Sequence, residues 1–176
     1  MEGGRLESAR KLSLALLVVT VVACNHPAPD QGPRPVTTIP ASQLVFADSL
    51  ESRPVTEILP QYPLNLQAQG VPAGFFAFVV VDTAGHVDVN SARFGREAPK
   101  AFFTAVCQVL PRMRFVPIRR DGEARPALVV LQYSFMTGAD TTAHRKVLAE
   151  AGLIRHMIRD EGMDSTLATL ARQPRC

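Results

Sequence analysis

The chain has 176 residues, of which 47% are hydrophobic, and a formal net charge of +3. The hydrophobic fraction fits a globular chain, and the roughly 115 residues after the first 59 are enough for one domain. The charge is uneven: residues 24–92 carry two basic and six acidic side chains, whereas residues 93–125 carry eight basic and three acidic ones. No nucleic-acid-binding signature accompanies the basic stretch, so we expect no nucleic-acid partner. We interpret the stretch as solvated surface, with an anionic partner as the alternative.

The N-terminus has the pattern of an export signal. Arg5, Arg10 and Lys11 precede an apolar run at residues 12–23. As a helix this run would be about 18 Å long, well short of a hydrocarbon core of roughly 30 Å. The pattern therefore predicts a signal peptide over residues 1–23 rather than a membrane span. A short uncleaved anchor is the alternative.

The small Ala23 followed by Cys24 resembles a bacterial lipoprotein lipobox, in which the cysteine thiol is lipidated and the chain is cut before it. Lipidation at Cys24 would place the mature protein outside the cytoplasm on a lipid anchor. Residue 25 is Asn rather than Asp, which by resemblance favours the outer membrane over the inner one. We therefore expect a lipid-anchored, periplasm-facing protein.

Residues 24–59 contain six prolines and few large apolar side chains before Leu44, which predicts a flexible, proline-rich linker. Within it, Val45-Phe46 and Ile58-Leu59 are candidates for docking on the domain.

Two further cysteines follow the expected lipidation site. An oxidising compartment would permit a bridge between Cys107 and Cys176, but one pair with a partner at the chain end leaves this open. We favour Cys107 as a small apolar residue on a helix. No CxxC motif or spaced histidine pair is present, so we expect no metal site.

A folded core begins near residue 75. The apolar run at residues 75–81 is followed by a turn ending at Gly85, and then by alternation in which Val87 and Val89 share a face. This pattern predicts a β-hairpin with one covered face. A short helical turn is possible at residues 64–68.

A helix and a closing strand follow. Pro99 can open a helix whose apolar stripe ends before Pro111. The strand ends at Phe135, with Val129, Leu131, Tyr133 and Phe135 on one face and Leu128, Val130, Gln132 and Ser134 on the other. The order strand, strand, helix, strand predicts an α+β fold: a two-layer domain in which a helix packs on one face of a small antiparallel sheet.

An ordered set of residues resembles the C-terminal domain of the TonB family. The set comprises Tyr62-Pro63, Gly70, the strand at 76–81, Gly85-His86-Val87, Ala105-Val106, Phe115-Val116-Pro117, Asp121-Gly122 and the strand after Pro126. The resemblance covers residues 60–136. It implies a protein-interaction domain in which a short peptide of an outer-membrane transport protein joins the sheet edge as a strand.

The resemblance places that edge on the closing strand, so we expect Leu128, Val130, Gln132 and Ser134 to bind the partner. Proline cannot donate to a ladder, so Pro126 indicates that this strand either starts there or lies at an edge. Family transducers have an N-terminal transmembrane helix that contacts an inner-membrane motor, and this chain has a lipobox instead. Two alternatives stay open: a genuine energy transducer with an uncleaved anchor, and a structural envelope lipoprotein.

Residues 137–176 predict a helical extension. Apolar residues recur at helical spacing over residues 147–158, and Gly162 fits a helix end. We favour packing of this extension on the domain, with dimerisation or a membrane surface as alternatives.

The sequence offers no catalytic set. Four scattered histidines lack a supporting Ser/His/Asp or Cys/His motif, and neither a glycine-rich phosphate loop nor HExxH occurs. We expect no enzyme activity, no cofactor and no small-molecule substrate.

Overall fold

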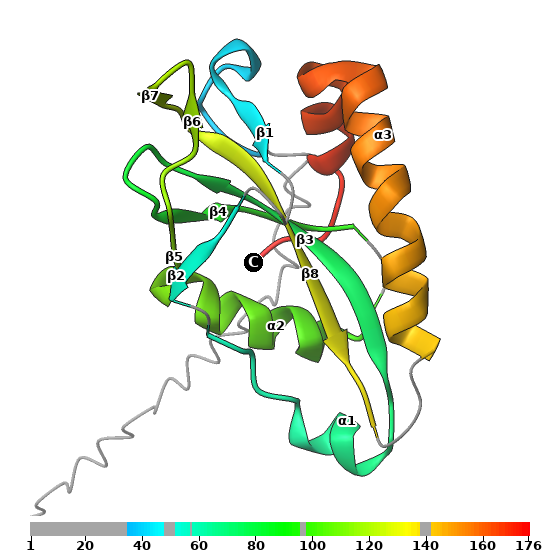
Figure 1. Cartoon of the computed structure of the whole chain (residues 1–176). Coiled ribbons are helices and arrows are strands. Elements are labelled where there is room, and N and C mark those ends of the chain that lie inside the picture. Colours follow the sequence, from blue (N-terminus) through cyan, green and yellow to red (C-terminus); the bar gives the residue numbers. More distant parts are fainter. Residues whose placement is uncertain (1–34, 48–51, 57, 96–97, 138–141) are drawn as a thin grey trace, which may run out of the picture. The chain divides into compact units, whose positions relative to one another are not determined.

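The computed structural model describes residues 35–47, 52–56, 58–95, 98–137 and 142–176. All of them belong to one unit, Gly32–Cys176. The expected signal peptide and Cys24 lie outside the described residues. The elements in chain order are η1 (Ala41–Gln43), β1 (Val45–Ala47), β2 (Pro54–Thr56), α1 (Leu64–Ala68), β3 (Ala73–Val81), β4 (Val87–Phe94), α2 (Lys100–Val109), η2 (Leu110–Arg112), β5 (Arg114–Phe115), β6 (Arg119–Arg120), β7 (Glu123–Ala124), β8 (Ala127–Phe135) and α3 (Thr142–Leu170) (Figure 1).

β3 and β8 form the centre of a four-stranded sheet with the order β1-β8-β3-β4. They pair antiparallel without interruption, from Ala73 opposite Phe135 to Val81 opposite Ala127. β4 continues the sheet beyond β3 in antiparallel pairing. Helices pack against this sheet, so the expected α+β class is confirmed.

One face of the sheet packs against α2. Phe75 and Val79 on β3 share a buried cluster with Phe102 and Val106 on α2, and Phe94 stacks on Phe103 at 4.4 Å between ring centroids. Helical spacing places the apolar side chains of α2 on one stripe, which explains why the helix lies on the sheet. The helix follows Pro99 and gives way to the 3₁₀ turn η2 at Leu110, as the prolines predict.

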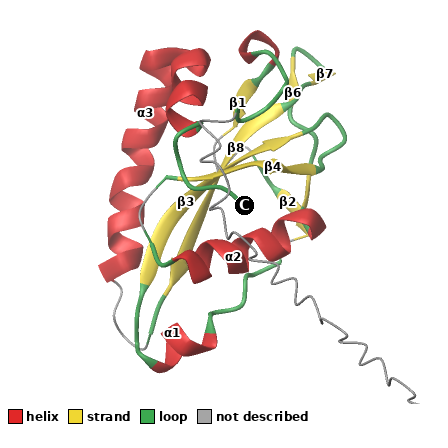
Figure 2. Cartoon of the chain, turned by 180° about the vertical axis from the view of Figure 1, so that it is seen from behind, coloured by secondary structure: helices red, strands yellow, loops and turns green. Residues whose placement is uncertain are grey.

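The other face packs against α3 (Figure 2). Phe76 and Phe78 on β3, and Leu128 on β8, join Ile158 and Leu170 of α3 in a second buried cluster. All nine residues of β3 are therefore buried. The expectation of a hairpin with one covered face is wrong for β3, because the C-terminal extension supplies a third layer.

α3 contains a break at Gly162, which has φ 80°. A positive φ suits glycine and interrupts the helical hydrogen bonds. At the break, the Thr166 hydroxyl donates a hydrogen bond to the Gly162 carbonyl at 2.9 Å. The break lets both parts of α3 contact the sheet, since Ile158 precedes it and Leu170 follows it.

Residues within the expected linker belong to the sheet. β1 pairs in parallel with the start of β8, with Val45 opposite Ala127 and Ala47 opposite Val129. The buried Arg93 donates through Nη2 to the carbonyl of Pro35 at 3.1 Å. Residues 35–47 are thus an integral part of the fold, which corrects the expectation of a flexible linker over 24–59 for this segment.

The C-terminal tail lies along β4, the opposite edge of the sheet. The Phe94 N–H donates to the Pro174 carbonyl at 2.9 Å, and the main chains of Arg175 and Arg93 form an isolated antiparallel β-bridge. Cys176 then forms a disulfide with Cys107 of α2. Cys107 lies on a helix beside the apolar core, as expected, but it also forms the bridge that the sequence left open.

The β3–β4 turn holds the short strand β5 in place. Asp82 Oδ1 accepts the N–H groups of Ala84 and His86 at 2.9 and 2.8 Å. Gly85 has φ 88°, and its carbonyl accepts the Phe115 N–H at 2.9 Å. β5 in turn pairs with β2. The turn therefore positions β5 and, through it, β2.

Candidate functional site

The outer edge of β8 is covered by β1 over part of its length. The pairing of β1 with β8 ends at Ala47 opposite Val129. Among the described residues, no strand pairs with β8 on this side from residue 130 onward. The second part of β8 therefore presents a sheet edge.

The β1 pairing shows which main-chain groups face that edge. The Val45 N–H donates to the Pro126 carbonyl at 3.0 Å. Successive residues of a strand direct their main-chain groups to opposite sides, so Leu128, Val130 and Gln132 face the same side as Pro126. Leu128 lies opposite Phe46 of β1. Val130 and Gln132 follow beyond the end of β1, where a further strand could join the sheet.

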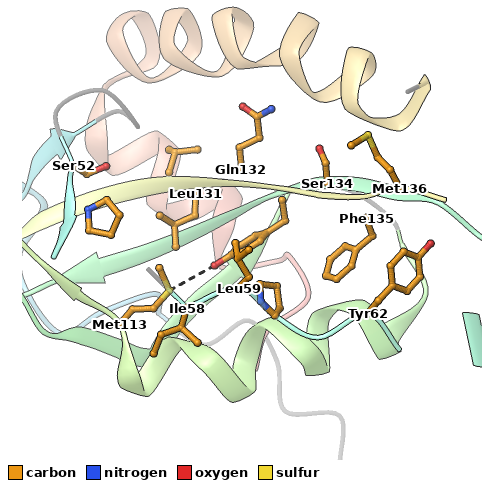
Figure 3. A pocket seen from close by; sticks show the side chains of 14 residues that line it. Ser52, Ile58, Leu59, Tyr62, Met113, Leu131, Gln132, Ser134, Phe135 and Met136 are labelled. Atoms are coloured by element: carbon orange, nitrogen blue, oxygen red, sulfur yellow. Dashed lines mark hydrogen bonds between the residues drawn. The ribbon is translucent and has the colours of Figure 1, made fainter. Parts of the chain in front are cut away.

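A groove of about 620 Å³ runs beside this edge (Figure 3). Side chains from β8, from the segment before α1 and from the turn after α2 line it. The lining residues are Ser52, Pro54, Ile58, Leu59, Pro60, Tyr62, Met113, Val130, Leu131, Gln132, Tyr133, Ser134, Phe135 and Met136. None of these described lining residues is charged, so the groove suits apolar or uncharged side chains.

Tyr62 forms the aromatic end of the groove. Its ring packs edge-on against Phe102 and Phe135, at 5.6 and 5.4 Å between centroids. Its hydroxyl donates to the Val71 carbonyl at 2.6 Å. Burial raises the pKa of Tyr62. The ring is therefore held rigidly between the α2 layer and the groove.

The groove floor is held in a similar way. The Tyr133 hydroxyl donates to Met113 Sδ at 3.7 Å, as the dashed line in Figure 3 marks. Figure 3 also shows Leu131 and Phe135 directed away from Gln132 and Ser134, which point toward α3. The two predicted faces of β8 are thus confirmed, since Val129 and Tyr133 share the α2-side cluster and Leu128 and Val130 the α3-side one.

The outer wall of the groove is apolar and exposed. Leu59 is 76% exposed and Met136 44% exposed. Pro54 and Pro60 have no N–H group to donate. The Val116 N–H donates to the Arg53 carbonyl at 3.0 Å and holds the start of this wall against β5. An exposed apolar rim beside a sheet edge is typical of an interaction surface.

The basic stretch contributes to the fold near the site rather than to the groove lining. Arg114 Nη1 donates to the Pro111 and Met113 carbonyls at 3.0 and 2.8 Å. Arg120 Nη2 donates to the Phe46 carbonyl of β1 at 3.2 Å. The described Lys100, Arg112, Arg114, Arg119 and Arg125 are exposed, as expected for solvated surface, whereas Arg93 of the same stretch is buried.

The four predicted partner-binding residues fall into different settings. Leu128 is fully buried and lies beside β1, so the expectation that the open edge starts there is corrected: β1 already occupies that position. Val130, Gln132 and Ser134 line the groove. Their binding of a partner stays a prediction.

Sequence reasoning did not assign Ile58, Leu59, Pro60 and Tyr62 to the site. Ile58-Leu59 was expected to dock on the domain, and Tyr62-Pro63 carried the family resemblance. Leu59 is 76% exposed rather than docked, and no local pattern in the sequence marked this wall of the groove.

The described residues contain no cluster of three His, Cys, Asp or Glu side chains suited to a metal ion. The His86–Asp82 contact, at 3.3 Å, is about half exposed and belongs to the turn. Within the described part of the chain, no helix is both long and apolar enough to cross a membrane.

No family model and no curated protein matches this chain. Among solved structures, the chain is similar to the solution NMR structure of the Pseudomonas aeruginosa TonB CTD, with 21% sequence identity and a TM-score of 0.42. The similarity covers 54% of this chain and 97% of that one.

Proposed function

We propose that this protein is a lipid-anchored, periplasm-facing interaction module that binds an extended peptide of an envelope protein by strand addition to β8. The observation that carries the proposal is the edge of β8 beyond Ala47, bordered by an uncharged groove. In strand addition, main-chain hydrogen bonds supply affinity and side-chain pockets supply selectivity. The edge of β8 offers main-chain groups, and the groove beside it offers pockets for side chains. The TonB resemblance of residues 60–136 favours an outer-membrane transport protein as the source of the peptide.

The disulfide supports a location outside the cytoplasm. Structural disulfides persist in oxidising compartments such as the bacterial periplasm. The bridge between Cys107 and Cys176 agrees with the export signal and with lipidation at Cys24. We propose the outer membrane as the more favoured location of the anchor.

Peptide titration tests the binding function. The detergent-solubilised full chain is titrated with peptides copied from periplasm-facing segments of outer-membrane transport proteins, with scrambled peptides as controls. A binding peptide is then N-methylated at alternate residues in two complementary versions. A strand donates to its neighbour through every second residue only. We expect one version to bind about tenfold more weakly and the other to bind like the parent. Equal sensitivity of both versions, or binding of the scrambled peptide, would argue against strand addition.

The mass and fractionation of the mature protein test the anchor. We expect a lipidated N-terminus at Cys24 and loss of membrane association in a Cys24→Ser variant. An unmodified, uncleaved N-terminus would instead favour the energy-transducer alternative. Binding to cell-wall material without peptide binding would favour the structural lipoprotein.

A further inference from the structure

β1 occupies the same edge of β8 that a partner strand would use, so a partner and β1 could compete for this edge. Two arrangements are possible in principle. A captured strand either displaces β1 or joins β8 beyond it. The contacts of β1 distinguish between them.

β1 is buried against both layers of the fold. Ala47 has no exposed surface and belongs to the α2-side cluster, whereas Phe46 packs against the α3-side cluster. The Val45 N–H donates to the Pro126 carbonyl, and Arg120 Nη2 donates to the Phe46 carbonyl. A strand that closes the core from both sides cannot leave without exposing it.

The residues before β1 are anchored too. Leu44 is 7% exposed and Val36 is 4% exposed, and both pack in the α3-side cluster. The Pro35 carbonyl accepts from Arg93, which is itself buried. Removal of β1 would therefore also leave apolar side chains from the preceding residues without their packing partners.

Within the described part of the chain, the length of β8 that pairs with no strand on this side is correspondingly short. β8 ends at Phe135, and β1 covers it up to Val129. The remaining residues 130–135 span about 20 Å as a strand. The described side chains that line the adjoining groove are uncharged.

We infer that β1 acts as a fixed stop that sets where, and over what length, a partner strand pairs with β8. This inference rests on the proposed function. The partner is an extended segment of at most about six paired residues, with uncharged side chains at the alternate positions that face the groove. It lies end to end with β1 along the same edge.

Residue-resolved amide hydrogen exchange tests this arrangement in the full chain. The Gln132 N–H reports on the outer edge of β8, and the Val45 N–H reports on β1. On addition of a binding peptide we expect slower exchange at Gln132 and unchanged exchange at Val45. Faster exchange at Val45 together with slower exchange at Gln132 would show displacement of β1 and overturn the inference, while strand addition itself would stand. If peptides bind and leave Gln132 unchanged, the proposed function fails as well.

Two matched variants provide an independent test. Arg120→Gln removes the donor to the Phe46 carbonyl, whereas Arg119→Gln removes a donor to the Gly122 carbonyl on the β6–β7 turn. Because β1 does not compete with the partner, both variants are expected to bind peptide with the same affinity, within about twofold. If Arg120→Gln binds about tenfold more tightly than Arg119→Gln, β1 is a competitor and the inference is wrong.

Discussion

Cys107 and Cys176 are joined by a disulfide that links α2 to the last residue of the chain, with their Cα atoms 5.6 Å apart. The preceding residues of the tail lie along β4, where Pro174 accepts the Phe94 N–H. The disulfide therefore holds the segment that covers one edge of the sheet, while β1 covers part of the other.

Loss of this disulfide is expected to destabilise the fold. The bridge spans a sequence separation of 69 residues, and closing a loop of this size stabilises a fold by about 2–4 kcal/mol. Cys176→Ser should lower the urea midpoint by a corresponding amount, and exchange of the Phe94 amide should become faster. Reductant should destabilise the parent and leave Cys176→Ser unaffected. Equal midpoints of the parent with and without reductant would contradict a stabilising role.

Tyr62→Phe is expected to lower the stability of the fold while leaving an aromatic ring at the end of the groove. The phenylalanine ring keeps the packing on Phe102 and Phe135 but loses the hydrogen bond to the Val71 carbonyl. We expect a loss of about 1–2 kcal/mol, because one hydrogen bond disappears and its acceptor is partly buried. Thermal denaturation measures the change. Tyr62→Leu, which also removes the aromatic contacts, should cost more, and an equal loss in both variants would indicate that the hydroxyl contributes little.

Gly85→Ala is expected to be strongly destabilising. Gly85 has a positive φ, and a Cβ at this position would overlap the carbonyl oxygen of Phe115. Gly122 also has a positive φ, 81°, but a Cβ there would meet nothing within 4 Å. Gly122→Ala should therefore cost about 1 kcal/mol, from backbone strain alone. Gly85→Ala should cost about 3 kcal/mol or more, because β5 must also move. Similar urea midpoints for the two variants would contradict the close approach of β5 to the turn.

Asp82 is expected to make a small contribution to stability that disappears in acid. Burial by itself raises the pKa of this carboxyl, but hydrogen bonds from the His86 and Ala84 N–H groups and the contact with the His86 side chain lower it overall. A lowered pKa means that the stabilisation is present above the unfolded-state pKa of 3.8 and is lost as the pH falls through the folded-state value.

Because the Asp82 side chain is 51% exposed, the effect should be below about 1 kcal/mol. Urea denaturation of the parent and of Asp82→Asn between neutral and acidic pH measures it. The difference in the free energy of unfolding between the parent and Asp82→Asn should shrink toward low pH. A difference that stays constant or grows would show that the charge of Asp82 does not stabilise the turn.

The sequence predicted the local elements of the fold well. The hairpin after residue 75, the helix between Pro99 and Pro111 and the alternating faces of the strand ending at Phe135 all agree with the structure. Each depends on residues close together in the chain, where hydrophobic periodicity and proline act directly. The short helix α1 and the break at Gly162 were predicted for the same reason.

The long-range partners were harder to predict. β1 has only three residues and pairs with β8 about eighty residues away, so no local pattern marks it. The contact of the C-terminal tail with Phe94 and the disulfide to Cys107 are equally non-local. For β3 a signal was present, because a continuous apolar run such as residues 75–81 is typical of a strand buried on both faces. The groove wall at Leu59 required the tertiary structure, since a proline-rich stretch predicts no element.

The third layer has a practical consequence for recombinant work. A fragment cut to residues 60–136 would bare Phe76, Phe78 and Leu128, which α3 covers in the intact protein. It would also lack the strand that begins at Val45. Such a fragment should precipitate or form inclusion bodies on overexpression, whereas a fragment spanning Gly32–Cys176 should stay soluble and monodisperse.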